Sequence, residues 1–443
     1  MKNRFLSFVL LGAVGLTGAC TKLNDPTVMN TLPVGQLDTT FNGTGFVVLT
    51  NTQGNDVGRG VTTDSNGNIV GISARDMGAT GYDMAAFRLT ASGAFDTSFN
   101  NTGLLTVDGS AGAANQTDSP FRVHVDANDN LLITGDAYNA SNNYDLIVWR
   151  VTSAGALDTS FDGDGILVQD SGGYDTGRQI MTDDQGRIIV AGVFSDNTNG
   201  DYEGAVWRLA PADGSLDTTF SGTGRYVRST ASMDWAKDMA IDGIGRHVVA
   251  GAQGADLAIW RVASNGGLDT SFGTNGVVTY SAANTNFRAE GVAIDAQGRI
   301  IVAGWRQVGG TYDAMLWRFD ASGNLDTSFG NNGTVILDSG GRDIAWDMEL
   351  DAVGNILVCG EWDNGTDRDM ILWRFLPDGT PDTRFGGDYD ADNTPDGYVL
   401  HASAAGVGND LGYRVALDAQ GRILVIGDSD AAADRDVVIW RFE

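Results

Sequence analysis

The sequence predicts an all-β protein, a seven-bladed β-propeller with four strands in each blade. The first observation behind this prediction is an aromatic-Arg pair that recurs at even spacing, with its arginines at Arg88, Arg150, Arg208, Arg261, Arg318, Arg374 and Arg441. The second is an Asp-Thr-x-Phe tetrad that begins at Asp38, Asp96, Asp158, Asp217, Asp269, Asp326 and Asp382. Six steps from the first of these arginines to the last cover 353 residues, or about 59 residues per repeat. A fixed period of this size indicates a repeat architecture.

The third observation is the pattern inside one repeat. In the fifth repeat, residues 291–295 alternate, 299–304 form an apolar run, 313–319 end in the aromatic-Arg pair, and 333–337 are again apolar. Gly and Asp at the intervening turns separate four short strands. Runs that are apolar on both faces indicate sheets packed between neighbours, as in a propeller. The alternative is a β-solenoid, whose turns are usually far shorter than this repeat.

The two ends of the array predict how the ring closes. The array starts with an outer-strand segment at residues 45–50 and stops after a third-strand segment at residues 437–442. If residues 58–64 form the first innermost strand, the N-terminal strand supplies the missing outer strand of the last blade. Closure of this kind removes an exposed sheet edge.

The repeats resemble those of the delta-60 repeat family, whose units read roughly as a GVAID-type strand, DGRIIVAG, a strand ending in aromatic-Arg, and LDTSFGxxG. Residues 295–304 (Asp-Ala-Gln-Gly-Arg-Ile-Ile-Val-Ala-Gly) and 324–330 match this pattern well. The resemblance covers about residues 37–443, with the mild departures Phe87, Glu203 and Pro381. It implies the propeller fold and brings no established activity with it.

The N-terminus resembles a bacterial lipoprotein signal. A positive start and a mostly apolar run lead into Leu16-Thr-Gly-Ala-Cys20, although the leucine stands four rather than three residues before the cysteine. The resemblance implies a signal peptide over residues 1–19, a lipidated Cys20 followed by a flexible tether over residues 20–36, and the propeller over residues 37–443. An ordinary cleaved secretory signal is the alternative.

Lipid on Cys20 would make a membrane the first partner of the protein, because each buried methylene contributes about 0.8 kcal/mol. We therefore expect an exported lipoprotein of the bacterial cell envelope, at the outer membrane or cell surface rather than the cytoplasmic membrane. The chain carries 57 acidic and 28 basic residues, a formal net charge of −29. Such a surface repels phosphate backbones, which argues against nucleic acid as a partner.

Residues that recur in every repeat are interpreted as scaffold. Arg150 and Arg318 each stand eight residues before a tetrad aspartate, Asp158 and Asp326 respectively, with a turn between them. We expect structural ion pairs here, because an unpaired buried charge is costly; a ring of metal or ligand sites is the alternative. A third-strand carboxylate recurs five residues before each repeat arginine and is expected to cap turns. These carboxylates are Asp83, Asp145, Glu203, Asp256, Asp313, Asp369 and Asp436.

Unrepeated residues are the candidates for function. Trp235, Trp305, Trp346 and Trp362 lie in or beside the variable loops. Aromatic rings among Asp and Asn suit stacking on sugar rings or holding a peptide. The alternative interpretation is that these rings plug the mouth of the central channel.

An acidic segment in the seventh repeat predicts a possible cofactor. Asp388, Asp390, Asp392 and Asp396 place oxygen ligands in the manner of calcium loops, although Val399 stands where an EF-hand has its closing Glu. A plain acidic loop is the alternative, and no motif indicates an organic cofactor. Catalytic motifs are poor, since the three histidines lie in different repeats and match no metal-ligand spacing.

The leading hypothesis is a non-enzymatic, lipid-anchored binding module that presents one loop face to a glycan, a peptide or an envelope protein. The competing hypothesis is a calcium-dependent propeller hydrolase or lyase with an acidic central site, by analogy of fold with gluconolactonase-like propellers. A purely structural surface protein is the third. Turnover abolished by a chelator would favour the enzyme, and saturable binding without turnover would favour the module.

Overall fold

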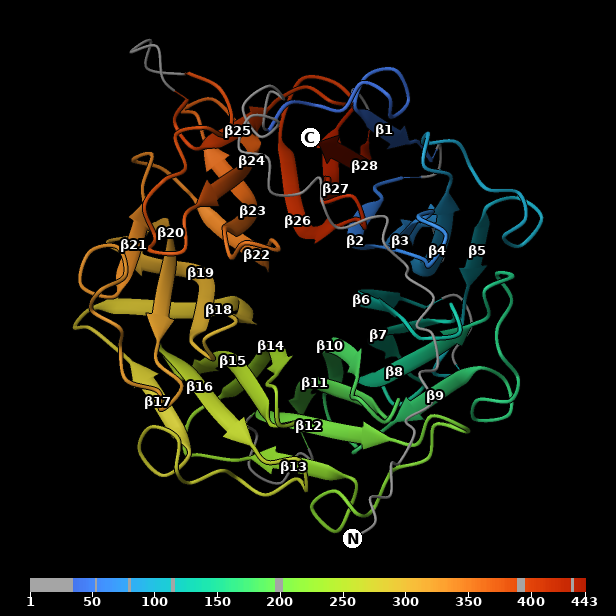
Figure 1. The fold of residues 1–443 in the computed structure, drawn as a ribbon. Helices are drawn as coiled ribbons and strands as arrows, with labels where there is room; N and C mark the ends of the chain where they lie inside the picture. The colour runs from blue at the N-terminus through green and yellow to red at the C-terminus, as the bar shows by residue number, and fades with distance from the viewer. Residues whose placement is uncertain are drawn as a thin grey trace, which may run out of the picture. The chain divides into compact units, whose positions relative to one another are not determined.

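The computed structural model describes residues 35–443, except residues 52–53, 79–80, 113–115, 196–201, 389–394 and 432–433. Within the unit formed by residues 34–443, seven four-stranded antiparallel sheets stand around a central axis (Figure 1). Every named element of the described residues is a β-strand, and none of them is a helix long and apolar enough to cross a membrane. The predicted fold class is therefore confirmed.

Blades are numbered here by their innermost strands. The innermost strands are β2 (Val57–Thr63), β6 (Asp118–Val125), β10 (Thr176–Thr182), β14 (Asp234–Ile241), β18 (Thr285–Ile294), β22 (Ile344–Leu350) and β26 (Asp410–Leu417). The second strands are β3 (Ile69–Asp76), β7 (Leu131–Tyr138), β11 (Ile188–Phe194), β15 (His247–Gln253), β19 (Ile300–Val308), β23 (Ile356–Asp363) and β27 (Ile423–Asp430). The third strands are β4 (Tyr82–Leu89), β8 (Tyr144–Val151), β12 (Glu203–Leu209), β16 (Asp256–Val262), β20 (Thr311–Phe319), β24 (Arg368–Phe375) and β28 (Arg435–Phe442). The outer strands are β5 (Leu104–Val107), β9 (Ile166–Gln169), β13 (Arg225–Arg228), β17 (Val277–Tyr280), β21 (Thr334–Leu337), β25 (Tyr398–His401) and β1 (Phe46–Leu49).

The last blade is closed by the first strand. β1 pairs antiparallel with β28, with Phe46 opposite Trp440 and Leu49 opposite Val437. Leu37 forms a further bridge with Phe442. The predicted closing strand over residues 45–50 is thus confirmed, and it leaves blade 7 without a free edge on β28.

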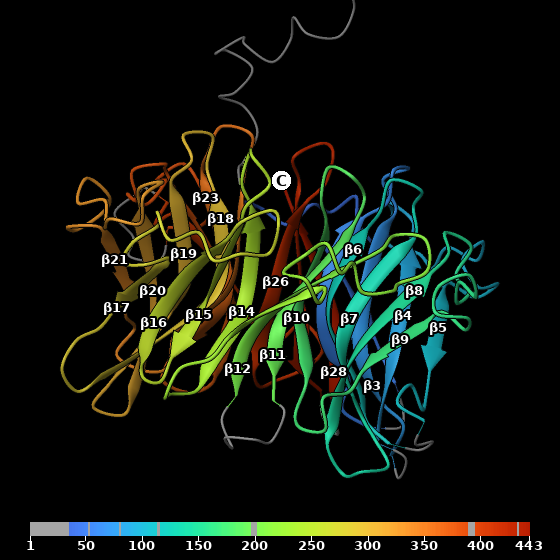
Figure 2. The same ribbon diagram turned by 90° about the horizontal axis from the view of Figure 1, so that it is seen from below.

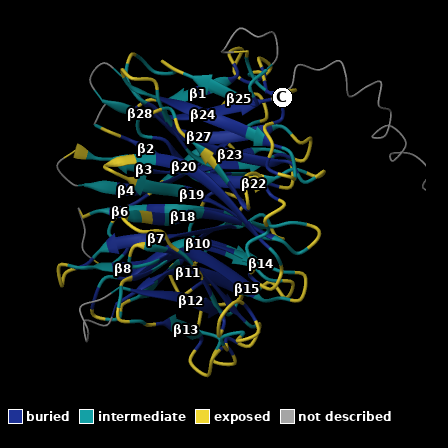
Figure 3. Cartoon of the chain, turned by 90° about the vertical axis from the view of Figure 1, so that its left-hand side faces the viewer, coloured by how far each residue is buried: buried dark blue, intermediate teal, exposed yellow. Residues whose placement is uncertain are grey.

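The apolar core lies between neighbouring blades. Figure 3 shows buried strands and more exposed connections at both ends of them. At the first contact, Ile72 and Met84 of blade 1 pack in one cluster with Val123, Ile133 and Trp149 of blade 2. Both faces of each sheet are covered in this way, which is why the second strands are apolar at successive positions.

The repeat arginines join each blade to its neighbour. Every one of them lies 2.8 Å from the aspartate of the following tetrad, and this includes Arg150–Asp158 and Arg318–Asp326. The guanidinium also lies over the tetrad phenylalanine, at 4.6 Å for Arg150 and Phe161. It then donates to a backbone carbonyl of the next blade, as Arg88 does to Ser153 at 2.7 Å. These contacts support the interpretation of the motif as scaffold.

Candidate functional site

The central channel has two ends, which we call the loop end and the turn end. The innermost strands begin at the loop end, where the loops between second and third strands also lie, and they finish at the turn end beside the repeated Asp-x-x-Gly turns. Figure 2 shows the strands running between these two ends. The candidate site is at the loop end, because the variable residues gather there.

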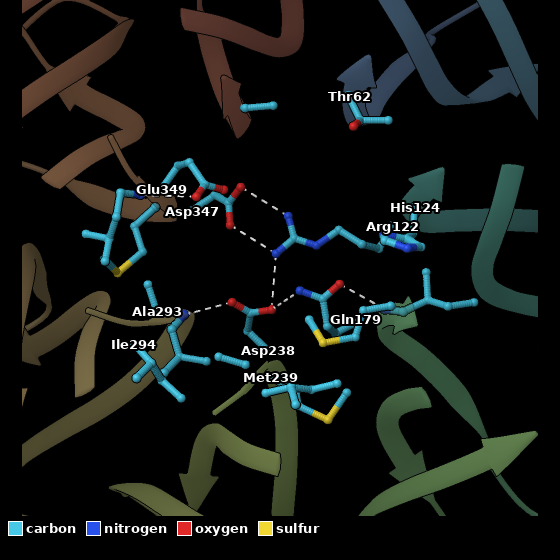
Figure 4. A pocket seen from close by; sticks show the side chains of 18 of the residues that line it. Thr62, Arg122, His124, Gln179, Asp238, Met239, Ala293, Ile294, Asp347 and Glu349 are labelled. Carbon is cyan, nitrogen blue, oxygen red and sulfur yellow. Dashed lines mark hydrogen bonds and ion pairs between the residues drawn. The ribbon is translucent and has the colours of Figure 1, made fainter. Parts of the chain in front are cut away.

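A polar cluster crosses the middle of the channel (Figure 4). Arg122 of blade 2 reaches Asp238 of blade 4 at 3.2 Å and Asp347 of blade 6 at 3.0 Å, and Gln179 donates a hydrogen bond to Asp238. Burial alone would lower the pKa of Arg122, but the two carboxylates together raise it above its usual value. The guanidinium therefore stays charged, and it forms ion pairs with both central carboxylates, Asp238 and Asp347.

On the turn side of this cluster lies a cavity of about 800 Å³. Its lining is acidic and includes Asp183, Asp242 and Glu349. Glu349 is exposed to the cavity, where desolvation by the surrounding channel walls, with a contribution from the charge of Asp347, raises its pKa to about 7. His124 also lines the cavity, but its ring hydrogen-bonds Thr182 at 3.0 Å and burial lowers its pKa. The other two histidines are separate from this site.

At the loop end, every innermost strand carries a bulge at the same place. The pairing with the second strand skips one residue in each blade. We call these residues the bulge ring: Arg59, Phe121, Arg178, Lys237, Glu290, Trp346 and Tyr413. They contact one another from blade to blade. Arg59 lies 5.3 Å from the Phe121 ring, Lys237 lies 3.4 Å from Glu290, and Trp346 lies 6.0 Å from Tyr413.

A glycine at the end of the apolar run of the second strand makes room for the bulge in blades 2 to 7. A Cβ at Gly135 would overlap the carbonyl oxygen of Ser119, and one at Gly251 would overlap that of Trp235. In blades 2 to 7 this glycine lets the two strands approach closely where the innermost strand bends, whereas in blade 1 Ser73 stands at the same position. A β-bulge of this kind turns one side chain per blade out of the regular pattern.

Three arginines in or directly beside the bulge ring form no ion pair with the described residues. The Nε atoms of Arg59, Arg178 and Arg414 are buried and without a hydrogen-bond partner, and none of the three forms an ion pair within the described part of the chain. Burial and the nearby charge of Arg122 lower the pKa of Arg414 to about 10. The charges of Asp136 and Asp428 act on Arg59. Burial, however, raises the pKa of both carboxyls, that of Asp428 to about 7.

An arc of half-buried aromatic rings extends outward from this end. Neighbouring ring centroids lie 5.1 to 5.7 Å apart along Tyr138, Tyr144, Tyr174, Tyr202 and Trp235, which come from blades 2, 3 and 4. Tyr174 also accepts a hydrogen bond from Arg178 at 3.3 Å, which joins the arc to the bulge ring. Only Trp235 of this arc was singled out from the sequence.

The other predicted residues fall in different places. Trp346 belongs to the bulge ring, and Trp305 donates a hydrogen bond to Glu290 at 3.2 Å. Trp362 instead stacks on Tyr398 of its own blade, with centroids 6.2 Å apart. Of the expected calcium loop, Asp388 and Asp396 are described, whereas Asp390 and Asp392 lie outside the described residues, as does Cys20.

Comparison with known proteins agrees with this architecture. Residues 127–161, 186–220, 297–329 and 354–385 match the family described as "Domain of unknown function (DUF5122) beta-propeller". Each segment spans the second and third strands of one blade and the tetrad that follows, which supports a family of β-propeller repeats. No curated protein matches the sequence.

Solved structures of the same fold have varied functions. A catalytically inactive virginiamycin B lyase from Staphylococcus aureus with quinupristin is 11% identical, with a TM-score of 0.50 over 89% of this chain and 98% of that one. Polysaccharide lyase Uly1 is 9% identical, with a TM-score of 0.50 over 87% and 90%. YCF48 bound to D1 peptide is 10% identical, with a TM-score of 0.47 over 93% and 98%. At such identities the likeness shows the fold alone.

Proposed function

We propose that this propeller is a binding module of the bacterial cell envelope that holds an acidic glycan at the loop end of its channel. Its repeats would be of the delta-60 type, and lipid on Cys20 would hold it at a membrane. The observation that carries the proposal is the set of arginines without acidic partners, in a chain whose net charge is −29. Acidic residues outnumber basic ones, so arginines left unpaired around one opening favour an anion from outside.

The geometry around Phe121 suits such a ligand. Arg59 and Arg178 both lie over its ring, at 5.3 and 4.0 Å, and among the described residues the hydrogen bond from Arg178 to Tyr174 is the one that uses a donor of either guanidinium. Guanidinium groups bind carboxylates and sulfates with two parallel hydrogen bonds. The aromatic arc beside Arg178 offers flat, half-exposed faces of the kind that stack on sugar rings. An elongated glycan with acidic groups uses both features.

Binding should therefore depend on Arg59 and Arg178. Changing either to methionine removes the charge but keeps the length of the stem, and we expect a loss of about 1.5–3 kcal/mol, roughly 10- to 100-fold in Kd. Isothermal titration with uronate-bearing, sulfated and neutral glycans measures this. Arg384→Met is the matched control, because its exposed side chain pairs with Asp382 away from the channel. Equal affinity for neutral and acidic glycans, or preferred capture of an acidic peptide, would contradict the proposal.

The membrane anchor is tested separately. When cells expressing the protein are fed radiolabelled palmitate, we expect label in the wild-type protein and none after Cys20→Ser, because the thiol is the acceptor. The variant should also move from the membrane fraction to the soluble one. Label that survives the substitution would place the lipid elsewhere, and a chain that is unlabelled from the start would favour an ordinary secretory signal.

A calcium-dependent hydrolase or lyase is the second candidate, and Glu349 is the observation in its favour. A carboxyl with a pKa of about 7 in a water-accessible cavity can act as an acid or a base. However, Asp238 and Asp347 are paired with Arg122, so the carboxylates nearest the axis are not available to a central cation. Turnover that is lost in Glu349→Gln and in chelator would favour this candidate.

A further inference from the structure

Three carboxylates from two blades meet where blade 1 contacts blade 2. Asp83 lies on the third strand β4, Asp108 directly follows the outer strand β5, and Asp118 begins the innermost strand β6 of the next blade. Oxygen atoms of the three lie within 4.8 Å of one another. Asp83 and Asp118 are only 6% and 1% exposed, whereas Asp108 is exposed to solvent. Two buried carboxylates beside a third repel one another in their ionised forms, and either a proton or a cation between them relieves the repulsion.

The hydrogen bonds of the cluster are incomplete in a way that points to a ligand. Asp118 accepts from the backbone nitrogens of Gly109 at 2.7 Å and Ser110 at 3.2 Å. Oδ1 of Asp83, by contrast, is buried and accepts no hydrogen bond. A side chain that is more than nine-tenths buried loses hydration, so a bare carboxylate oxygen there is unfavourable unless it is protonated or a cation compensates it.

At two other blade contacts an arginine of the chain compensates such carboxylates. At the contact of blades 3 and 4, Arg228 lies 3.4 Å from Asp234, the residue equivalent to Asp118. In blade 5, Arg306 lies 2.6 Å from Asp313, the residue equivalent to Asp83. Each of these acidic contacts therefore includes a cation supplied by the chain.

The first contact receives no such cation. Arg75 stands opposite Asp83 in the strand register, as Arg306 does opposite Asp313, but it forms no ion pair with it among the described residues. Its charge lowers the pKa of Asp83, yet burial and the charge of Asp108 prevail and raise that pKa to about 6. Burial likewise raises the pKa of Asp118 to about 7, despite its hydrogen bonds.

We infer that Asp83, Asp108 and Asp118 form a binding site for a hard divalent cation, calcium by its ligand chemistry, that joins blade 1 to blade 2. Carboxylate oxygens are the ligands such ions prefer, and calcium tolerates the irregular geometry of side chains drawn from three strands. The ion would supply the positive charge that Arg228 and Arg306 supply in later blades. Because Asp118 lies three residues before Phe121 of the bulge ring, the site would also fix the strand that carries this ring.

A neighbouring cluster provides a comparison. Asp145, Asp170 and Asp175 meet in the same way at the contact of blades 2 and 3. There Asn139 donates a hydrogen bond to Oδ1 of Asp145 at 2.7 Å, so the oxygen that is bare in Asp83 already has a partner. Oδ1 of Asp369 and of Asp436, at the same position in blades 6 and 7, is also buried without a hydrogen bond, but among the described residues no cluster of three acidic groups forms around either, so the inference is confined to the first contact.

Calcium titration of the full-length protein, after removal of metal with a chelator, tests the site. We expect saturable binding and a higher melting temperature with calcium, and we expect Asp83→Asn to lower the number of ions bound by one. Asp108→Asn is the second variant. Its side chain is exposed, so the protein should fold, and the affinity of this site should fall roughly tenfold or more as one charge is lost.

The controls separate this site from others. Asp338→Asn removes the residue equivalent to Asp108 in blade 5, where Arg306 supplies the cation, and should leave calcium binding unchanged. The acidic loop that contains Asp388 is the other predicted calcium site, and Asp388→Asn reports on it independently. Unchanged stoichiometry in Asp83→Asn together with unchanged affinity in Asp108→Asn would overturn the inference. A calcium effect abolished only by Asp388→Asn would overturn it as well and assign the ion to the loop.

Discussion

Replacing Asp38 with asparagine is expected to lower the free energy of unfolding by about 3–5 kcal/mol, the usual cost of breaking a buried ion pair. Asp38 and Arg441 have side chains only 3% and 1% exposed, and their ion pair is 2.8 Å long. The pair also joins residues 403 positions apart, the first tetrad and the last repeat arginine. Its loss leaves the buried guanidinium of Arg441 without a carboxylate among the described residues, with donated hydrogen bonds to Ala91 and Thr40 alone, and loosens the segment that closes blade 7.

Asp96→Asn is the matched control for this prediction. Asp96 makes the equivalent 2.8 Å pair with Arg88, but the two side chains are 17% and 11% exposed and both belong to blade 1. Denaturant unfolding followed by circular dichroism should show a smaller loss for Asp96→Asn than for Asp38→Asn. Equal losses would mean that ring closure adds nothing to the pair. The double variant Asp38→Asn, Arg441→Met should recover part of the stability, because it removes the uncompensated charge.

The fold could be predicted from the sequence because each blade meets the same packing requirement. The repeat arginine and the tetrad aspartate recur since every blade must contact a neighbour on both faces, and the glycine after the apolar run recurs in blades 2 to 7, where it lies against the bulged innermost strand. The closing strand followed from the same reasoning, because one blade lacked an outer strand. The repeated residues therefore determine the architecture, and the fold can be predicted from them when the ligand is not known.

The bulge ring could not be predicted so readily. Its members are six different residue types in seven blades, from Arg59 to Phe121 to Glu290, so no single recurring residue marks the position. The sequence signal for the bulge ring is indirect. It is the repeated glycine of the second strand, Gly135 in blade 2, which lies against the innermost strand where that strand bends. Which side chain the bend presents depends on a one-residue skip in register, and that skip is visible only in three dimensions.

Trp362 shows how the same limitation affects a single residue. Trp305 directly follows Gly304 and reaches Glu290 of the bulge ring, whereas Trp362 stands two residues after Gly360. Successive side chains of a strand point to opposite faces, so this difference of one position sends the two indoles to opposite sides of their blades. A sequence argument that only placed both tryptophans beside variable loops could not separate them.

In the absence of metal, the protein is expected to become less stable as the pH rises from about 4.5 to 7.5. Burial raises the pKa of Asp118 to about 7 and that of Asp83, together with the charge of Asp108, to about 6. A carboxyl in the unfolded chain loses its proton near pH 4, so between these values the folded protein binds more protons than the unfolded chain does. Stability that is present at low pH is then lost through this window, on the order of 3 kcal/mol for Asp118 alone.

Denaturant unfolding at pH 4.5 and 7.5, with chelator and then with calcium, measures this effect. The tetrad aspartates act in the opposite direction only at lower pH, since Ser271 and Arg261 hold the pKa of Asp269 at about 2 despite its partial burial. Glu349 also contributes to the loss, so Glu349→Gln should remove one part of the slope and Asp83→Asn another. Calcium should restore stability at pH 7.5 and have little effect at pH 4.5, because a cation binds the ionised carboxylates only. Stability that rises steadily with pH in chelator would show that the three carboxylates tolerate one another's charge, and the argument for a cation between them would fail with it.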